Sequence, residues 1–221
     1  MVTCCQCDGI ESEFNARFAE RELRHFRRRG LRRSTRLLID SLRWAVSPGA
    51  TLLDVGGGIG AIHHVLLDEG VANATQVDAS SAYIATARDE AGRRGHADRL
   101  ELIHGDFVSL SPSLPDADVV TLDRVICCYP DMPALVGAAA RKAGRAFGAV
   151  YPPDVLWLRF GVRCINALMR LRRSEFRVFV HSPKAIDAVL REHGLERVTQ
   201  RRTIAWEVVT YRRTTERPLH G

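Results

Sequence analysis

Lysine is almost absent from this 221-residue chain, in which only Lys142 and Lys184 stand among 32 basic residues. Arginine therefore carries the net charge of +6, and because a GC-rich genome alone favours arginine, the charge is weak evidence for a nucleic-acid partner. No run of about 18 apolar residues occurs, which argues against a membrane-spanning helix. Neither a basic nor an apolar segment follows Met1, so we expect no signal peptide and a cytoplasmic protein. The composition, 46% hydrophobic and 26% charged, is typical of a globular protein.

The chain also lacks an even spacing of its cysteines. Its six cysteines are Cys4, Cys5, Cys7, Cys127, Cys128 and Cys164. In a reducing compartment this spacing predicts no disulfide framework. The N-terminal thiols together with Cys127 or Cys128 could form a tetrahedral zinc set, bind a soft substrate or act as redox groups. We predict no metal site and interpret the cysteines as small residues packed around a lid.

Apolar periodicity and turn residues divide the chain into three regions. Residues 10–46 predict helices, and residues 51–151 alternate short apolar strands with helices. The remainder adds an amphipathic helix, a further helix and two strands. Strands that alternate with helices indicate parallel βαβ units with helices on both sheet faces. We therefore predict a helical lid over residues 1–46 and a core over residues 47–221, with an amphipathic insertion at 154–174.

The expected elements have recognisable boundaries. Strands are predicted at 51–55, 75–78, 100–103, 118–122, 146–151, 196–203 and 205–212, and helices at 61–69, 81–94, 133–142 and 183–193. Gly30 interrupts the first region, and Ser34 is predicted to cap the helix that follows it. Ser80 and Asp131 are the predicted caps of two core helices.

A glycine-rich segment, Gly56-Gly57-Gly58-Ile59-Gly60, follows the first strand, directly after Asp54. Glycines permit positive φ and let the backbone approach a ligand. Asp78 ends the second strand, where a carboxylate can accept both hydroxyls of a ribose. Asp106 and Phe107 follow the third strand, where a carboxylate can accept from an adenine amino group and an aromatic ring can cover the base. These residues predict a nucleotide-like ligand at one edge of the sheet.

This combination resembles the class I S-adenosylmethionine-dependent methyltransferases over residues 51–151, and residues 182–212 also fit. The resemblance implies an α/β, Rossmann-like, doubly wound fold with a mostly parallel seven-stranded sheet, an antiparallel last strand and N-terminal helices. It implies S-adenosylmethionine as cofactor and S-adenosylhomocysteine as product. The cofactor contacts that it implies are Asp54, Gly56, Gly57, Gly58, Gly60, Asp78, Ala79, Asp106, Phe107, Asp123 and Arg124. A nicotinamide or flavin enzyme is the main alternative, but the chain leaves little room for a second mononucleotide half.

Methyl transfer from a sulfonium is an in-line displacement, which an enzyme accelerates mainly by positioning and by excluding water. Asp123 could orient the methionyl part of the cofactor or accept a substrate proton; alternatively it only pairs with Arg124. His181 could act as a general base near neutral pH, or it is a surface histidine. Substrate contacts are predicted from Phe18, Cys128, Tyr129 and Trp157.

We expect a methyltransferase, monomeric or homodimeric, for a small-molecule acceptor at O, N, S or C. Magnesium-protoporphyrin methyltransferases have a comparable small plan, which makes a tetrapyrrole carboxylate one compatible acceptor. A second hypothesis is an RNA-directed methyltransferase or RNA-binding protein that uses the Arg24–Arg36 stretch. Neither the acid-Pro-Pro-aromatic order after the fourth strand nor a Pro-Cys dipeptide of nucleic-acid methyltransferases occurs. A third is a membrane-surface protein whose 154–174 helix lies on anionic lipid, although an internal lid explains the same pattern.

Overall fold

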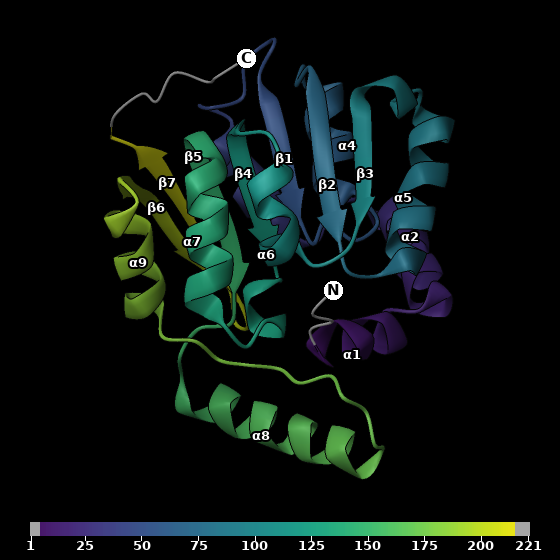
Figure 1. Cartoon of the computed structure of the whole chain (residues 1–221), viewed down its shortest axis with the longest axis vertical. Coiled ribbons are helices and arrows are strands. Elements are labelled where there is room, and N and C mark those ends of the chain that lie inside the picture. The colour runs from purple at the N-terminus through teal and green to yellow at the C-terminus, as the bar shows by residue number, and fades with distance from the viewer. Residues whose placement is uncertain (1–4, 215–221) are drawn as a thin grey trace.

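The computed structural model describes residues 5–214, with side chains from Gly9 onward. In this part of the chain seven strands form one sheet with helices on both faces (Figure 1). They are β1 (Thr51–Val55), β2 (Asn73–Asp78), β3 (Leu100–His104), β4 (Ala117–Asp123), β5 (Ala143–Tyr151), β6 (Leu195–Arg202) and β7 (Glu207–Arg213). The order is β3-β2-β1-β4-β5-β7-β6, and β7 runs antiparallel to both neighbours. The predicted fold class, with its antiparallel last strand, is confirmed.

The helices begin and end largely where capping residues predict. They are α1 (Cys5–Glu13), α2 (Ala16–Arg29), α3 (Arg33–Leu42), α4 (Ala61–Asp68), α5 (Ser81–Arg94), α6 (Phe107–Leu110), α7 (Met132–Lys142), α8 (Leu156–Leu171) and α9 (Pro183–Glu192). Ser80 and Asp131 cap α5 and α7 as predicted. The prediction for Ser34 is wrong: Arg32 occupies the N-cap of α3, and Ser34 is buried inside the first turn. Asn15 caps α2 by accepting a hydrogen bond from the Phe18 amide.

Two hydrophobic layers enclose the sheet. On one face α7 and α9 pack through Leu135 and Ile186 against β4 and β5, and on the other α3 and α4 pack through Leu38 and Leu66. Alternate residues of β4 supply both layers, because successive side chains of a strand point to opposite faces. This packing brings the carboxyl ends of β1, β2 and β4 to one edge of the sheet. Helix α2 lies against α5 near that edge (Figure 1).

Helix α8 lies within residues 154–174, for which an amphipathic insertion is predicted, and none of the other long helices in the described residues is as exposed. It lies apart from the sheet, on the far side of α1 (Figure 1), and none of its residues is buried. On the side of the helix that carries Leu158, Val162 and Met169, these side chains are only half-buried. No helix in the described residues combines the length and the hydropathy that crossing a bilayer requires.

Candidate active site

A cavity of about 360 Å³ lies at the carboxyl ends of β1, β2 and β4, next to α2. Most of the sequence-predicted site residues border it. They are Phe18, Gly56, Gly57, Gly58, Asp78, Ala79, Asp106, Phe107, Asp123, Arg124, Cys128 and Tyr129. The loops that follow four different strands thus converge on one space, which is where open α/β sheets bind their ligands.

The glycine loop after β1 takes a conformation that only glycine adopts without strain. Gly56 and Gly58 have φ of +63° and +59°. At Gly57 a Cβ atom would lie 2.6 Å from Oδ2 of Asp54, so even alanine would collide there. The side chain of Gln76 fixes the loop by donating to the Gly58 carbonyl over 2.8 Å. The loop therefore turns bare backbone toward the cavity.

Asp78 joins the end of β2 to this loop. Its Oδ2 accepts a hydrogen bond from the Gly58 amide at 2.9 Å, and its Oδ1 accepts one from the Ser80 amide at 2.8 Å. The carboxyl is buried yet borders the cavity. Burial raises the pKa of Asp78 to about 6, although both backbone hydrogen bonds oppose the rise. A carboxyl that titrates close to neutrality therefore faces the proposed ligand space.

Asp54 lies beneath the loop and does not border the cavity, although sequence reasoning placed it among the cofactor contacts. Its Oδ1 accepts a hydrogen bond from Thr121 Oγ1 at 2.7 Å, and its Oδ2 lies 3.7 Å from Nδ1 of His63. Burial raises the pKa of Asp54 to about 7 and lowers that of His63 to about 3. Gly60 also lies outside the lining, because it begins α4 against the His63 ring. These residues support the loop from below.

Asp123 and Arg124 end β4 at the opposite side of the loop. Asp123 Oδ2 accepts from Thr35 Oγ1 of α3 at 2.6 Å, and its Oδ1 lies 3.3 Å from Nε of Arg124. Arg124 has φ of +64°, rare for a residue with a side chain, and its Nη1 lies 3.8 Å from Oε1 of Glu22. Burial raises the pKa of Asp123, while the Arg124 guanidinium opposes that rise. An ion pair anchored by α2 and α3 thus borders the cavity.

An aromatic cluster also borders the cavity. Phe14 lies 5.4 Å from Phe18 and 5.4 Å from Phe176, both edge to face, and it stacks on Tyr83 at 5.7 Å. Tyr83 donates its hydroxyl to Glu22 at 2.8 Å, and burial raises its pKa. Sequence reasoning missed Tyr83, although its position five residues after Asp78, early in the next helix, could have indicated it. No local sequence pattern indicated Phe176, Thr35 or Glu22 as site residues. They border the cavity because segments outside the strand ends pack against it.

Besides Asp54 and Gly60, two further predicted residues are not brought to the cavity. Trp157 lies on α8, and His181 hydrogen-bonds the Tyr129 carbonyl through Nε2 at 3.0 Å. Burial lowers the pKa of His181, against the effect of its backbone hydrogen bonds. His181 therefore holds the loop that carries Tyr129 rather than facing the ligand space.

The two cysteines after β4 lie together, with 3.9 Å between the sulfur atoms of Cys127 and Cys128. Their mutual hydrogen bond and burial raise the pKa of the Cys128 thiol. Within the described residues, no three His, Cys, Asp or Glu side chains are grouped as a metal site would require. Cys4 and the side chains of Cys5 and Cys7 lie outside the described part.

Comparisons with known proteins agree with this geometry. Residues 53–144 match the sequence model of a family described as a methyltransferase domain. Magnesium protoporphyrin IX methyltransferase from Synechocystis PCC 6803, crystallised with S-adenosylhomocysteine, is similar in structure, with a TM-score of 0.71 and 19% identity over 93% of this chain and 98% of that one. The same protein was also crystallised with S-adenosylmethionine.

Residues 53–144 thus match a methyltransferase domain, and the chain has the fold of the class I S-adenosylmethionine-dependent methyltransferases. Both findings support a methyltransferase that uses S-adenosylmethionine. A methyltransferase from Haloferax volcanii, in complex with the Trm112 activator, is also similar to this methyltransferase, with a TM-score of 0.68 and 16% identity over 95% and 98% of the two chains. No curated protein matches the sequence significantly. At these identities the structural similarity shows a shared fold. The acceptor named for the Synechocystis enzyme and the activator named for the Haloferax enzyme are properties of those two proteins.

Proposed function

We propose that this methyltransferase transfers a methyl group to a small apolar or aromatic molecule in the cavity beside the glycine loop. The observation that carries the proposal is that one enclosed space has two unlike walls. Backbone and carboxylates of the strand ends form one wall, and the Phe14–Phe18–Tyr83–Phe176 cluster forms the other. The cavity volume of about 360 Å³ is in the range of small-molecule sites.

The polar wall fits the cofactor. The exposed backbone of Gly56–Gly58 leaves room for close approach, and Asp78 offers a carboxylate to the ribose diol. Asp106 and Phe107 would hold the adenine, and Asp123 with Arg124 would hold the charged amino-acid end. When bound, S-adenosylmethionine supplies an electrophilic methyl group on a sulfonium. Asp106 also caps α6, since its Oδ2 accepts a hydrogen bond from the Ser109 amide at 3.2 Å.

The apolar wall suits the acceptor. Aromatic side chains supply much contact area and exclude water, so the rings favour a flat or hydrophobic molecule over a highly charged one. Cys128 and Tyr129 also border the cavity and are proposed acceptor contacts. Asp123, held by Thr35 and Arg124, is a proposed positioning residue for either ligand. We further infer that the N-terminal helices, residues 10–46, form the cover of this space.

The test follows methyl label from S-adenosylmethionine into extracts of small metabolites and into total RNA, using the purified enzyme. Label that partitions into the organic phase supports the proposal. Label that ribonuclease releases would support the RNA-directed alternative instead. At low S-adenosylmethionine concentration, Asp78→Asn should lower incorporation about tenfold to a hundredfold, whereas Asp89→Asn, an exposed substitution on α5, should leave it unchanged. Undiminished incorporation by Asp78→Asn would overturn the assigned cofactor wall.

A further inference from the structure

Helix α8 turns its largest hydrophobic side chains toward solvent. Leu156, Phe160 and Leu171 are 84%, 68% and 82% exposed, and Trp157 is 55% exposed. Helices on the surface of a globular protein normally bury this face against the core. A contiguous apolar surface without protein cover marks an interaction site.

The exposed face lies opposite the side by which the protein holds the helix. Trp157, Phe160, Leu168 and Leu171 follow one another at helical spacing and share a face. On the other side Asn166 donates Nδ2 to the Val178 carbonyl at 2.8 Å and accepts the Val178 amide at 2.9 Å. The two hydrogen bonds set the rotation of the helix, so its apolar face points outward.

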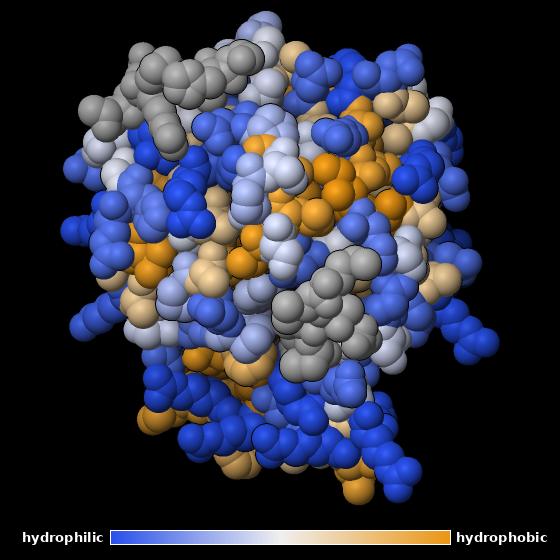
Figure 2. Space-filling model, in the orientation of Figure 1, coloured by the Kyte–Doolittle hydropathy of each residue, from blue (hydrophilic) through white to orange (hydrophobic). Residues whose placement is uncertain are grey.

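The charge on α8 has a single sign. Arg159, Arg163 and Arg170 form a stripe beside the apolar face, and no acidic residue occurs between Leu156 and Leu171. Two further arginines, Arg172 and Arg173, follow at once. Figure 2 shows strongly hydrophilic residues facing the viewer along this helix, with hydrophobic residues emerging at its rim. Of the three arginines of the stripe, only Arg159 forms an ion pair within the described residues, with Asp154.

We propose that α8 is a docking helix for a bilayer surface that contains anionic lipids. An amphipathic helix with arginines beside a Trp, Phe and Leu face lies in the interface plane, its apolar side among the acyl chains. The arginines then meet acidic headgroups. A second copy of this chain fits the surface less well, because pairing two such helices would bring their arginines together with no carboxylate between them.

The segment that holds α8 also borders the cavity. Val178, which holds Asn166, borders the cavity, and so does Phe176, whose ring packs on Phe14 at 5.4 Å. Docking through α8 would bring the cavity near the interface from which an apolar acceptor could enter. This last step rests on the proposed function, whereas the docking itself does not.

Binding is measured by co-sedimentation of the full-length protein with vesicles of phosphatidylcholine alone or mixed with phosphatidylglycerol. We expect more than about tenfold stronger binding to the anionic vesicles, since each arginine near such a surface contributes favourably, and weaker binding at high salt. The fluorescence of Trp157 should shift to the blue on binding, and Trp157→Phe should remove that shift. Because no methyl transfer is measured, the result is independent of the acceptor.

Two double variants and a control separate the contributions. Phe160→Glu with Leu171→Glu should abolish binding to both vesicle types, and Arg163→Glu with Arg170→Glu should abolish the preference for anionic lipid. Val198→Glu changes a 42% exposed apolar residue on the edge strand β6, away from α8, and should bind normally. Unchanged thermal unfolding verifies that the variants are folded. Absent vesicle binding by the unmodified protein would overturn the proposal, as would a dimer in light scattering that Phe160→Glu dissociates.

Discussion

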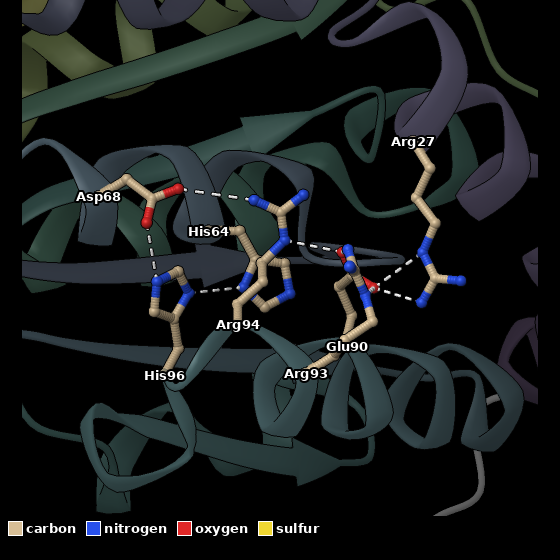
Figure 3. Close-up of polar contacts among 7 residues, drawn as sticks. All are labelled: Arg27, His64, Asp68, Glu90, Arg93, Arg94 and His96. Carbon is tan, nitrogen blue, oxygen red and sulfur yellow. Dashed lines mark hydrogen bonds and ion pairs between the residues drawn. The ribbon is translucent and has the colours of Figure 1, made fainter.

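Arg27 of α2 donates two hydrogen bonds to Oε2 of Glu90 of α5, from Nε at 3.0 Å and from Nη2 at 2.5 Å, and the Glu90 side chain has no exposed surface. Arg93 and Arg94 donate to the same carboxylate, so three guanidinium groups surround it (Figure 3). Arg27 comes from the N-terminal helices and Glu90 from the βαβ core. The cluster therefore fastens the proposed cavity cover to the core.

Replacing Glu90 by glutamine should destabilise the protein at neutral pH by about 1–3 kcal/mol, because charged hydrogen bonds to a buried acceptor are lost. Burial alone would raise the pKa of Glu90, but the hydrogen bonds from Arg93, Arg27 and Arg94 hold it well below the ordinary 4.5. A lowered pKa contributes stability that is complete above about pH 4.5 and is lost as the pH falls further. Denaturant unfolding should show the difference from the unmodified protein shrink in acid. Glu69→Gln, which removes an exposed pair with Arg43, should have a smaller effect.

Cofactor affinity should rise as the pH passes upward through about 6, because the Asp78 carboxyl has its pKa there and accepts the ribose diol best when ionised. Calorimetry with S-adenosylhomocysteine across this range measures the effect. Asp78→Asn should weaken binding about tenfold to a hundredfold and flatten the pH profile. Asp54→Asn tests a second carboxyl with a raised pKa, and a flattened profile in that variant alone would assign the titration to Asp54.

Gly58→Val should remove cofactor binding while leaving a folded protein. Valine at φ of +59° is strained by about 1–2 kcal/mol, and its Cβ would meet only ordinary contacts with Tyr83 at 3.6 Å. Gly95→Val is the matched control, with φ of +72° and open space around its Cβ. Both variants should lose similar stability in thermal unfolding. Equal cofactor binding by the two would mean that the loop is only a turn.

Hydrogen exchange in residues 14–26 should slow when S-adenosylhomocysteine binds, because Phe14, Phe18 and Phe26 border the same cavity. In the unliganded protein Arg27→Gln should speed exchange in α2 and leave α7 unchanged, since it frees one helix from Glu90. Arg24→Gln, an exposed substitution on α2, should leave hydrogen exchange in both α2 and α7 unchanged. If hydrogen exchange in α2 changed neither when the ligand binds nor when Arg27 is replaced, the segment would be a fixed part of the core.

Local signals in the sequence determined much of the fold and part of the candidate site. The alternation of short strands and capped helices predicted the βαβ order. The glycines after β1 and Asp78 at the end of β2 predicted the ligand edge. These predictions depend on neighbours within a few residues, where periodicity, capping and backbone freedom act. Ser34 failed as a cap because its burial against the core decided its position instead.

Tertiary packing alone decided which predicted residues border the cavity. It buried Asp54 under the glycine loop, placed Trp157 on an outward-facing helix and brought Thr35 to Asp123 across 88 residues. It also enclosed Glu90, an ordinary helical glutamate in the sequence, with Arg27 from a distant helix. Such contacts depend on how helices dock on the sheet, and no local pattern specifies that docking. The sequence by itself thus determined the elements and the ligand edge, whereas the docking of α2, α3 and α8 decided the walls of the site, because burial and pairing are properties of surfaces that meet only in the folded chain.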